Sequence, residues 1–576
     1  MIAEVLVSKK VNRDSFFDYS IADNTNAQLY SLVEVPFGQT KAQGIIFDFK
    51  NKSNYKTKDI LGLLSEGPLF TKYQIQLSKK ISSDYLSSIN EALFSFLPKM
   101  NKRDLKTMGA RTKIKISKNQ PKIAYLAQFS ERIEYFCQSI IKEGQNLLVL
   151  PQINQVKDCV KRLKKLDPSI EIYEWHSSLK SRQKSLIWQK ILSKENICIV
   201  STRHGLFLPF TNLSLVMIDD PTNFAYHEDQ SPYYNAFDIA RSLSKIFSSK
   251  LIVGDLIPDI ITYSAIKNKK IDVAEKKSKV EIVNCGSWKN IINNRDSCKK
   301  LNDAIQANSK VCVVGPFKNE SRLFCNDCEE SIGCANCKNE FYIEGKNLCS
   351  KCFRPQTLIC PNCNGANIIN LGLTYCKISL DLEKLNPDLK GKISKDPLAD
   401  KQIVLVSLND IAKLPPIFDA AIVPNFDQMA GFAFLNFREK LFRSLQSLKS
   451  SVSKNILIFS DSHQFENYFF QIQKNDWRSF QDSQLKERKQ NNLPPFTKSV
   501  LAVSKNKNPD FSKKILDDFI QKIKFNKHTI SLEQSNLNQS RALIFIQNKY
   551  WDEFKKTVSK SLPRQIHLEV NPVGFE

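Results

Sequence analysis

Long apolar runs are missing from this sequence of 576 residues. No stretch approaches the roughly 18 to 20 consecutive apolar residues that a membrane-spanning helix needs. The opening residues, MIAEVLVSKK, also lack the charged-then-apolar pattern of a secretory signal peptide. Both absences argue against a membrane protein, and we expect a soluble, cytoplasmic chain with no membrane partner.

A disulfide framework is absent as well. Eight of the 15 cysteines crowd into residues 325–363, whereas the other seven are scattered singly through the rest of the chain. A secreted protein stabilised by disulfides would not leave most of a large chain without cysteine pairs. Clustered C-x-x-C pairs in a reducing compartment indicate a metal site instead.

The composition supplies packed globular domains and a strong positive charge. Hydrophobic residues make up 42% of the chain, and 576 residues are too many for a single core. The formal net charge of +25 favours a polyanionic partner, because a basic protein releases the counterions condensed on nucleic acid. Nucleic acid is the leading candidate and an anionic membrane the second. A general lysine-rich bias is the alternative explanation of the charge.

The first part of the chain alternates strand-like and turn-like stretches. Strands are predicted at residues 4–7, 32–35 and 44–47, and an amphipathic helix at about 73–85. We interpret residues 1–98 as a small β-rich domain. Residues 99–122 follow with nine Lys or Arg against one acid, Asp104, and are predicted to be a basic linker. Such a linker either crosses phosphates or is merely a solvated connection.

From residue 123 onwards, short apolar strands alternate with polar helices, which is typical of a parallel, doubly wound sheet. The predicted strands are 123–126, 146–150, 170–174, 197–201, 213–218, 250–254, 311–314, 402–407, 420–423 and 455–459, with helices at 131–142 and 181–192. We expect one α/β lobe at 123–279 and a second at 280–470. The second lobe carries a cysteine-rich insertion at 325–366, and an α/β C-terminal domain follows at 471–576.

The clustered cysteines form four C-x-x-C pairs. A C-x-x-C turn holds two thiolates at the separation that one tetrahedral ion requires, so four pairs supply two complete four-cysteine sites. Thiolates select zinc, or less often iron, over magnesium or calcium. Because sulfur fills every position, the predicted metals are structural, and we expect two Zn²⁺ per chain.

Three ways of pairing the four turns are possible. Residues 340–347 (EFYIEGKN) have the pattern of a β-hairpin, which would bring the two inner pairs together. We therefore favour a nested arrangement. One ion is then held by Cys325, Cys328, Cys360 and Cys363, and the other by Cys334, Cys337, Cys349 and Cys352.

Four motifs stand beside the cysteine-rich segment: SFFDY at residues 15–19, VPFG at 35–38, STRHGLFLPF at 201–210 and LPPF at 493–496. Together they resemble the PriA family of replication-restart helicases (primosomal protein N′). The first two look like that family's 3′-end-binding domain. The third is similar to its G-T-R-S-A-L-F-x-P-F segment, and the fourth to the L-P-P-[WF] start of its C-terminal domain. The cysteine-rich segment resembles the family's zinc region, where nested pairing is the rule.

The resemblance covers nearly the whole chain, except that the basic linker stands where the family has a winged-helix domain. It implies a β-rich N-terminal DNA-binding domain, two RecA-like lobes with an inserted two-zinc module, and an α/β C-terminal domain. It also implies a nucleoid-associated protein that binds stalled or abandoned replication forks and helps to reload the replicative helicase. The implied partners are forked and single-stranded DNA, primosome components, and the replicative helicase or its loader.

Carried over by position, the family's 3′-end pocket comprises Phe17, Asp18, Tyr19, Gly38 and Lys58. A carboxylate can accept a hydrogen bond from a terminal 3′-hydroxyl while an aromatic ring stacks on the base. Without the resemblance, the preferred interpretation is that Phe17 and Tyr19 pack a strand and that Asp18 caps a turn. In the zinc region, Phe341 and Tyr342 either stack on bases or pack the hairpin.

The residues that ATP hydrolysis needs are absent. Phosphate binding calls for G-x-x-x-x-G-K-[ST], but residues 127–132, after the first strand of the first lobe, read AQFSER. The family's D-E-x-H becomes DDPT at residues 219–222, and its arginine-rich motif becomes QSLKSSVSK at residues 446–454. An arginine finger alone is worth roughly 10³ to 10⁵ in rate. We therefore predict no ATPase or helicase activity and no ATP or Mg²⁺ binding.

Some alternatives stay open at this stage. Asp219 and Asp220 are either a residual magnesium site or, as we prefer, carboxylates left at a strand end. The protein as a whole could instead be an active ATP-dependent 3′-to-5′ helicase with an unrecognised phosphate loop. It could also be a zinc-bearing RNA-binding or translation-associated module. DNA-stimulated ATP turnover would indicate the active helicase. A preference for structured RNA over forked DNA with a free 3′ end would indicate the RNA-binding module.

Overall fold

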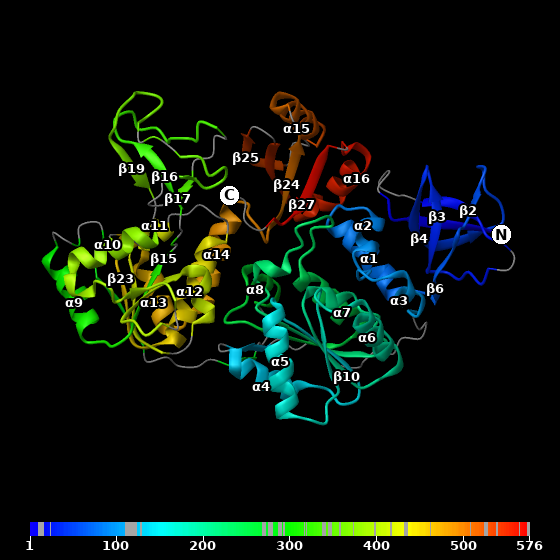
Figure 1. Cartoon of the computed structure of the whole chain (residues 1–576), viewed down its shortest axis with the longest axis horizontal. Coiled ribbons are helices and arrows are strands. Elements are labelled where there is room, and N and C mark those ends of the chain that lie inside the picture. Colours follow the sequence, from blue (N-terminus) through cyan, green and yellow to red (C-terminus); the bar gives the residue numbers. More distant parts are fainter. Residues whose placement is uncertain are drawn as a thin grey trace. The chain divides into compact units, whose positions relative to one another are not determined.

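The structure is a computed structural model of the chain (Figure 1). It describes residues 1–9, 16–22, 25–109, 124–126, 129–267, 272–274, 280–285, 288, 291, 294–315, 317, 320–336, 341–343, 348–355, 357, 359–371, 374–396, 399–414, 417–424, 426–430, 436–460, 462–506, 508–523, 528–536, 539–563 and 565–572. These residues form two compact units. Unit 1 comprises Met1–Glu275 and Ser483–Phe575, and unit 2 comprises Lys276–Asp482. Within the described residues, none of the helices combines the length and the apolar character needed to cross a bilayer.

Unit 1 begins with a six-stranded sheet of order β5-β2-β1-β4-β3-β6. Its strands are β1 (Ile2–Val7), β2 (Phe16–Ser20), β3 (Ser31–Phe37), β4 (Thr40–Lys50), β5 (Lys58–Asp59) and β6 (Gly62–Pro68). All neighbours are antiparallel except β2 and β5. Gly38 turns the chain between β3 and β4 at a φ of +59°, a backbone conformation that residues other than glycine rarely adopt.

Three helices follow the sheet: α1 (Lys72–Asp84), α2 (Ile89–Phe94) and α3 (Lys102–Lys106). Thr71 with Gln74 and Ser88 with Glu91 form capping boxes that satisfy the first backbone amides of α1 and α2. The third helix lies in the segment predicted as a linker. It packs against β6 and α6 (Ser181–Ser193).

The basic linker is therefore partly folded, which corrects the sequence interpretation. Leu105 and Met108 are buried, and the indole Nε1 of Trp188 donates to the carbonyl of Gly109 at 3.0 Å. Lys102 forms an ion pair of 2.6 Å with Glu34. The sequence did not predict that α3 packs against β6 and α6, because its apolar residues are few and are spaced among lysines. Residues 110–122 lie outside the described part of the chain.

The first lobe is a parallel five-stranded sheet of order β12-β11-β8-β10-β9. Its strands are β8 (Gln145–Val149), β9 (Ile172–Trp175), β10 (Ile197–Ser201), β11 (Leu213–Asp219) and β12 (Lys250–Gly254). Its helices are α4 (Phe129–Ser139), α5 (Ile153–Leu166), α6, α7 (Ala236–Phe247) and α8 (Ile260–Ile266), with short 3-10 turns η1 (Arg203–Phe207) and η2 (Phe224–Tyr226). One core joins α4 and α5 to one face of the sheet, and α6 and α7 pack on the other. This confirms the doubly wound expectation.

One predicted strand pairs differently. Residues 124–126 form β7 (Ala124–Leu126), which pairs in parallel with β13 (Asp272–Ala274) in a separate two-stranded sheet. The strand exists as predicted, but its hydrogen-bonded neighbour depends on a segment about 150 residues away, which the sequence pattern does not specify.

Unit 2 contains the second lobe, a parallel sheet of order β14-β23-β22-β15-β21-β20. The strands are β14 (Glu281–Asn284), β15 (Val311–Gly315), β20 (Ile393–Ser394), β21 (Ile403–Ser407), β22 (Phe418–Val423) and β23 (Val452–Ile458). The helices are α9 (Arg295–Gln306), α10 (Tyr375–Leu385), α11 (Phe426–Ala430), α12 (Phe437–Ser451), α13 (Glu466–Lys474) and α14 (Trp477–Gln490), with η3 (Pro387–Leu389), η4 (Leu408–Lys413) and η5 (His463–Phe465). Between β15 and β21 the chain inserts a small antiparallel sheet, β18-β17-β16-β19. Its strands are β16 (Glu320–Cys325), β17 (Phe341–Ile343), β18 (Leu348–Cys349) and β19 (Ile368–Leu371).

The C-terminal domain is a four-stranded antiparallel sheet of order β25-β26-β24-β27 with two helices on one face. Its elements are β24 (Thr497–Lys505), α15 (Pro509–Ile523), β25 (His528–Asn536), β26 (Gln539–Gln547), η6 (Asn548–Tyr550), α16 (Trp551–Ser561) and β27 (Ile566–Val570). Together the β-rich N-terminal domain, the two parallel lobes, the cysteine-rich insertion and this α/β domain confirm the predicted fold class.

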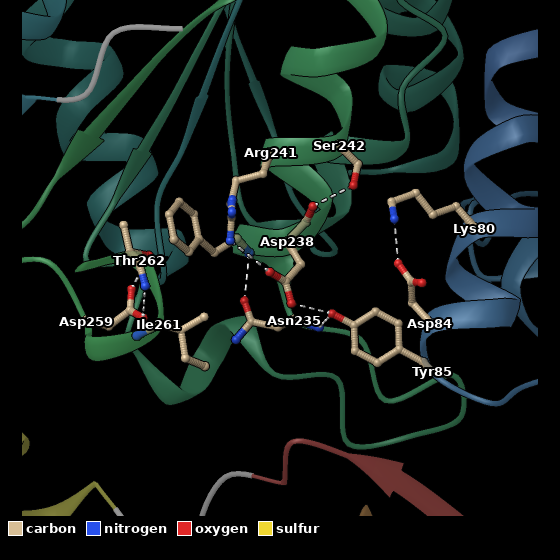
Figure 2. A network of polar contacts seen from close by, with 11 residues as sticks. Lys80, Asp84, Tyr85, Asn235, Asp238, Arg241, Ser242, Asp259, Ile261 and Thr262 are labelled. Carbon is tan, nitrogen blue, oxygen red and sulfur yellow. Dashed lines mark hydrogen bonds and ion pairs between the residues drawn. The ribbon is translucent and has the colours of Figure 1, made fainter. Parts of the chain in front are cut away.

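Helix α1 ties the N-terminal domain to the first lobe. Figure 2 shows Tyr85 reaching across to α7, where its hydroxyl donates to Asp238 Oδ2 at 2.9 Å and accepts from the backbone amide of Asn235 at 3.1 Å. Near the start of α1, Gln74 Nε2 donates to the carbonyl of Phe207 at 2.8 Å. The ring of Phe207 stacks on Phe96 with centroids 4.3 Å apart. The STRHGLFLPF segment thus serves as a docking site for the N-terminal domain.

Candidate functional site

Strand β2 carries the three central residues of the predicted 3′-end pocket. Phe17 packs edge-on against Phe37 with ring centroids 5.5 Å apart, and the hydroxyl of Tyr19 donates to the carbonyl of Pro36 at 3.0 Å. Both rings join the core on one face of the sheet. Because side chains alternate along a strand, Asp18 is directed to the opposite face. The three consecutive residues are therefore divided between two faces.

Gly38 and Lys58 lie close to the aromatic part of this group. Lys58 on β5 is directly paired with Tyr19 on β2, and it is exposed. Gly38 follows Phe37 in the β3–β4 turn, where an added Cβ would meet no atom within 4 Å. Phe17 and Tyr19 thus contact the residues just before Gly38, and Tyr19 is paired with Lys58, while the Asp18 carboxylate lies on the other side of the same strand.

The interpretation made without the family resemblance agrees with the packing of Phe17 and Tyr19, but Asp18 is held by two donors from elsewhere in the chain and does not cap a turn. Ser53 Oγ donates to Asp18 Oδ2 at 2.6 Å, and Lys50 Nζ donates to Asp18 Oδ1 at 3.1 Å. Lys50 also contacts Glu4, which pairs with Asp18 across β1 and β2. The hydrogen bond from Ser53, with help from Lys50, lowers the pKa of the Asp18 carboxyl, so this group stays ionised at neutral pH.

The outer cysteine cluster comprises Cys325, Cys328, Cys360 and Cys363. All four sulfur atoms lie within 4.8 Å of one another. The Sγ atoms of Cys325 and Cys363 are 3.5 Å apart, and those of Cys328 and Cys360 are 3.6 Å apart. Four sulfurs around a tetrahedral ion with Zn–S bonds of about 2.3 Å would be about 3.8 Å apart. The cluster therefore fits one metal ion and is compatible with zinc.

The inner cluster comprises Cys334, Cys349 and Cys352, whose sulfur atoms also lie within 4.8 Å of one another. The Sγ atoms of Cys334 and Cys352 are 3.6 Å apart. Strands β17 and β18 pair in antiparallel fashion and place Cys349 opposite Tyr342. The fourth predicted ligand, Cys337, lies outside the described residues. The described thiols are grouped as the nested arrangement requires.

Three of the C-x-x-C turns share one backbone conformation. In each, the amide of the first cysteine donates at 2.9 Å to the carbonyl five residues later, on Glu330, Arg354 and Gly365 respectively. The residue before each of these carbonyls has a left-handed φ of 57° to 59°. Those three residues are Glu329, Phe353 and Asn364. A repeated, sterically costly turn around sulfur pairs is compatible with a metal site.

Tyr342 is 1% exposed, so its ring packs the cysteine-rich core and does not present a face for stacking on a base. The side chain of Phe341 lies outside the described residues. Of the two predicted roles for Tyr342, the packing role is the one that its burial supports.

At the carboxyl end of β11, Asp219 forms a buried ion pair with Arg132 on α4. Arg132 Nε lies 2.5 Å from Asp219 Oδ1, and the two side chains are 12% and 1% exposed. Burial is the largest influence on the pKa of Arg132 and would lower it, but the attraction and hydrogen bond of Asp219, together with the charges of Asp255 and Asp220, raise that pKa overall. The strand-end carboxylate is therefore neutralised from within the protein, which neither sequence interpretation of Asp219 anticipated.

Neighbouring groups shape this strand end. The hydroxyl of Tyr226 donates to the carbonyls of Val149 and Asp219, at 3.0 and 2.7 Å. A Cβ on Gly254 would lie 2.5 Å from Asp219 Oδ1 and 2.9 Å from Arg132 Cδ, so a larger residue would disturb the ion pair. Asp220 turns away with a φ of +50° and accepts from Asn223 Nδ2 at 2.7 Å. The two adjacent aspartates therefore have different partners.

Sequence reasoning missed two residues of these sites, Arg132 and Ser53. Arg132 is the last residue of AQFSER. The one feature of the sequence that could have pointed to its role is its positive charge, six residues after a predicted strand of the first lobe. Ser53 lies in a lysine-rich loop, and nothing in its neighbours along the chain marks it as a partner of Asp18.

Comparisons with known proteins find similarity at the N-terminal end and over most of the chain. Residues 4–98 match the family described as the 3′ DNA-binding domain (3′BD) of PriA. The replication restart protein PriA of Borreliella burgdorferi is 26% identical, over 86% of this chain and 84% of that protein. The protein of the same name from Rickettsia prowazekii is 24% identical, over 87% of both chains. The chain is thus similar to replication restart proteins PriA over most of its length, and it carries a PriA-type 3′ DNA-binding domain.

Among solved structures, RecG bound to a three-way DNA junction is 12% identical, with a TM-score of 0.33 over 72% of this chain and 46% of that one. The DExH-box NTPase HrpB of E. coli is 9% identical, with a TM-score of 0.33 over 61% and 40%. At such TM-scores the likeness carries no argument about mechanism.

Proposed function

We propose that this chain, a relative of the replication restart proteins PriA, binds stalled or abandoned replication forks and helps to reload the replicative helicase without hydrolysing ATP. Its N-terminal domain supplies DNA binding, and the net charge of +25 supplies the electrostatic attraction to forked and single-stranded DNA. Primosome components and the replicative helicase or its loader are the proposed protein partners. A nucleoid-associated, cytoplasmic location follows from this role.

The proposed 3′-end pocket is built from Phe17, Asp18, Tyr19, Gly38 and Lys58. The ionised Asp18 carboxylate accepts a hydrogen bond from a terminal 3′-hydroxyl. Lys58 is exposed beside the aromatic end of the strand and pairs with a backbone phosphate. The space over Gly38 is open, because an added Cβ would meet no atom within 4 Å, and this lets the DNA backbone approach closely. The positive φ would strain any other residue at this position.

The observation that carries the loss of ATPase activity is the Arg132–Asp219 ion pair. Hydrolysis of ATP requires a strand-end carboxylate that helps to hold Mg²⁺ against the phosphates. Here Asp219, the last residue of β11, is 1% exposed and in contact with a guanidinium, and the adjacent Asp220 accepts a hydrogen bond from Asn223 Nδ2. A metal ion would have to displace a buried cation to bind there. The lobe is therefore proposed to be a structural scaffold.

The two cysteine clusters are proposed to hold one Zn²⁺ each, the outer one through Cys325, Cys328, Cys360 and Cys363. The inner one would use Cys334, Cys337, Cys349 and Cys352. Bound zinc would fix the three repeated turns and supply the stability that a sheet of such short strands lacks. With four sulfur ligands per ion, these sites are structural.

The test is ATP hydrolysis by the purified, zinc-loaded full chain, measured with and without forked DNA while fork binding is followed in the same samples. Tight fork binding without ATP turnover is the expected result. DNA-stimulated turnover would overturn the proposed loss of activity and favour the active-helicase alternative. A preference for structured RNA over a fork with a free 3′ end would overturn the restart role itself.

A further inference from the structure

Residues 51–57 form a loop between β4 and β5 that lies over the Asp18 carboxylate. Lys50 ends β4 and Lys58 begins β5, so both ends of the loop belong to the sheet. Ser53 in this loop donates to Asp18 Oδ2 at 2.6 Å, and the backbone amide of Tyr55 donates to Ser53 Oγ at 3.2 Å. The loop is therefore attached to the carboxylate through one serine hydroxyl.

Both oxygens of Asp18 have a donor in this arrangement. Lys50 contacts Oδ1 and Ser53 contacts Oδ2, and the Asp18 side chain is 14% exposed. A DNA strand that ends in a 3′-hydroxyl brings the same chemical group that Ser53 already presents, an uncharged hydroxyl donor. A strand that ends in a 3′-phosphate brings acceptor oxygens and negative charge, which the ionised carboxylate repels.

Resting on the proposed 3′-end pocket, we propose that Ser53 is a specificity-determining residue of that pocket. Its hydroxyl occupies the Asp18 oxygen that the terminal 3′-hydroxyl takes, and binding exchanges one hydroxyl for the other. Only an uncharged donor can complete the exchange, so Ser53 sets the affinity for a free 3′ end, whereas the charge of Asp18 rejects a blocked one.

The same loop offers a surface for the rest of the terminal nucleotide. Tyr55 is 81% exposed, more than any other large hydrophobic side chain in the described part of the chain. Lys52 and Lys56 flank it and are exposed as well. An aromatic face between two cations suits an unstacked base and its phosphates.

The experiment measures binding of the full chain to fluorescent DNA strands that are identical except for a 3′-hydroxyl, a 3′-phosphate or a 3′-deoxy end. The variants are S53A, which removes the competing hydroxyl, S53T, which keeps it, and D18N, which removes the carboxylate charge. Because Ser53 lies in a surface loop and S53T retains its hydrogen bond, S53T serves as the matched control. Thermal unfolding of each variant establishes that it is folded.

The expected result is that S53A binds the 3′-hydroxyl strand about 10- to 150-fold more tightly than the natural chain, in line with the loss of one competing hydrogen bond to a charged group. Its affinity for the 3′-phosphate strand is expected to stay the same, and S53T is expected to match the natural chain. If S53A leaves every affinity unchanged, or weakens all three equally, while D18N abolishes the preference for a 3′-hydroxyl, the pocket stands and the role of Ser53 is overturned. If D18N retains the full preference, the pocket itself is overturned.

Discussion

The Arg132–Asp219 pair shows how one substituted residue changes the chemistry of a strand end. A buried carboxylate is costly unless a partner compensates it. The Arg132 guanidinium at 2.5 Å offsets part of that cost, although burial still raises the pKa of the Asp219 carboxyl. Gly254 leaves the room that the two side chains need. The strand-end carboxylate is therefore paired with a cation of the protein itself.

We predict that Arg132→Ala and Asp219→Ala each lower the free energy of unfolding by about 3 to 5 kcal/mol, because each leaves one buried charge without its partner. The double variant R132M/D219L should recover most of that loss, since it removes both charges together. Urea unfolding of the full chain, followed by tryptophan fluorescence, measures both effects. A loss in the double variant as large as the sum of the single losses would contradict this account.

At the scale of elements, helix α1 is the main connection between the N-terminal sheet and the first lobe. Tyr73 is fully buried against Phe247, with ring centroids 4.7 Å apart, and its hydroxyl accepts from the amide of Phe210 at 2.8 Å. Tyr85 makes the corresponding polar contact at the other end of the helix. Because α1 is hydrogen-bonded to the first lobe at both of its ends, these contacts fix the orientation of the helix on the lobe as well as its position.

Tyr85→Phe is expected to destabilise the chain by about 1 to 3 kcal/mol, because Asp238 and the amide of Asn235 lose a buried partner. Tyr55→Phe is the matched control, since Tyr55 is 81% exposed and its removed hydroxyl should change stability little. Chemical denaturation of both variants provides the comparison. Equal stability of Y85F and Y55F would show that the hydroxyl contact contributes nothing.

Helix α13 depends on a buried lysine of α12. Lys449 is 4% exposed, and its Nζ donates to the carbonyls of Ile472 and Gln473, at 2.9 and 3.1 Å, and to Asn475 Oδ1 at 2.8 Å. These bonds reach carbonyls at the end of α13, where the carbonyl of Ile472 also accepts from Gln446 Nε2 and from the amide of Asn475. Burial lowers the pKa of Lys449 to about 8, against an ordinary value of 10.5.

This shift has a definite consequence for pH. Between about pH 8 and 10.5 the unfolded chain binds a proton at Lys449 that the folded chain does not, so the stability contributed by this group rises with pH. Relative to Lys449→Met, the natural chain should gain roughly 2 to 4 kcal/mol over that range. Denaturation of both proteins at pH 7.5 and 10.5 checks this. A constant difference between them across the range would contradict the lowered pKa.

At the scale of the whole molecule, the chain divides into two units that are not two consecutive stretches of sequence, because unit 1 combines residues from both ends of the chain. One continuous core contains residues from the N-terminal sheet, helix α1, the first lobe and the C-terminal domain, all within unit 1. The cysteine clusters lie in unit 2. The predicted DNA pocket and the predicted metal sites therefore belong to different units, which should respond separately to perturbation.

Metal removal tests that separation. Cys328→Ser is expected to lower the zinc content, measured by plasma mass spectrometry, from two ions per chain to one, and to lower the unfolding temperature of unit 2. Cys376→Ser is the control, because Cys376 is exposed and lies outside both clusters. Hydrogen exchange resolves the two units, and unit 1 should show unchanged protection in both variants. Lost protection of the N-terminal sheet in C328S would contradict the predicted independence.

Much of the fold was predictable because local patterns specify strands and helices. The lobe strands at 197–201 and 250–254 agree with β10 and β12 residue for residue, and the predicted hairpin after Cys334 is confirmed by the pairing of β17 with β18. The docking of α3 was not predictable, since its two buried apolar residues carry too little periodicity to outweigh the surrounding lysines. The partner of β7 was equally hidden, because strand pairing is a long-range choice.

The sequence by itself determined the architecture, the grouping of eight cysteines into C-x-x-C turns, and the absence of a phosphate loop, because each depends on residue types at fixed spacings. Only the tertiary structure decided which groups meet. It placed Arg132 on Asp219 and Ser53 on Asp18, and it divided Phe17 and Asp18 between opposite faces of one strand. Such contacts join residues that lie tens of positions apart, and their energies depend on burial and distance, which no local pattern specifies.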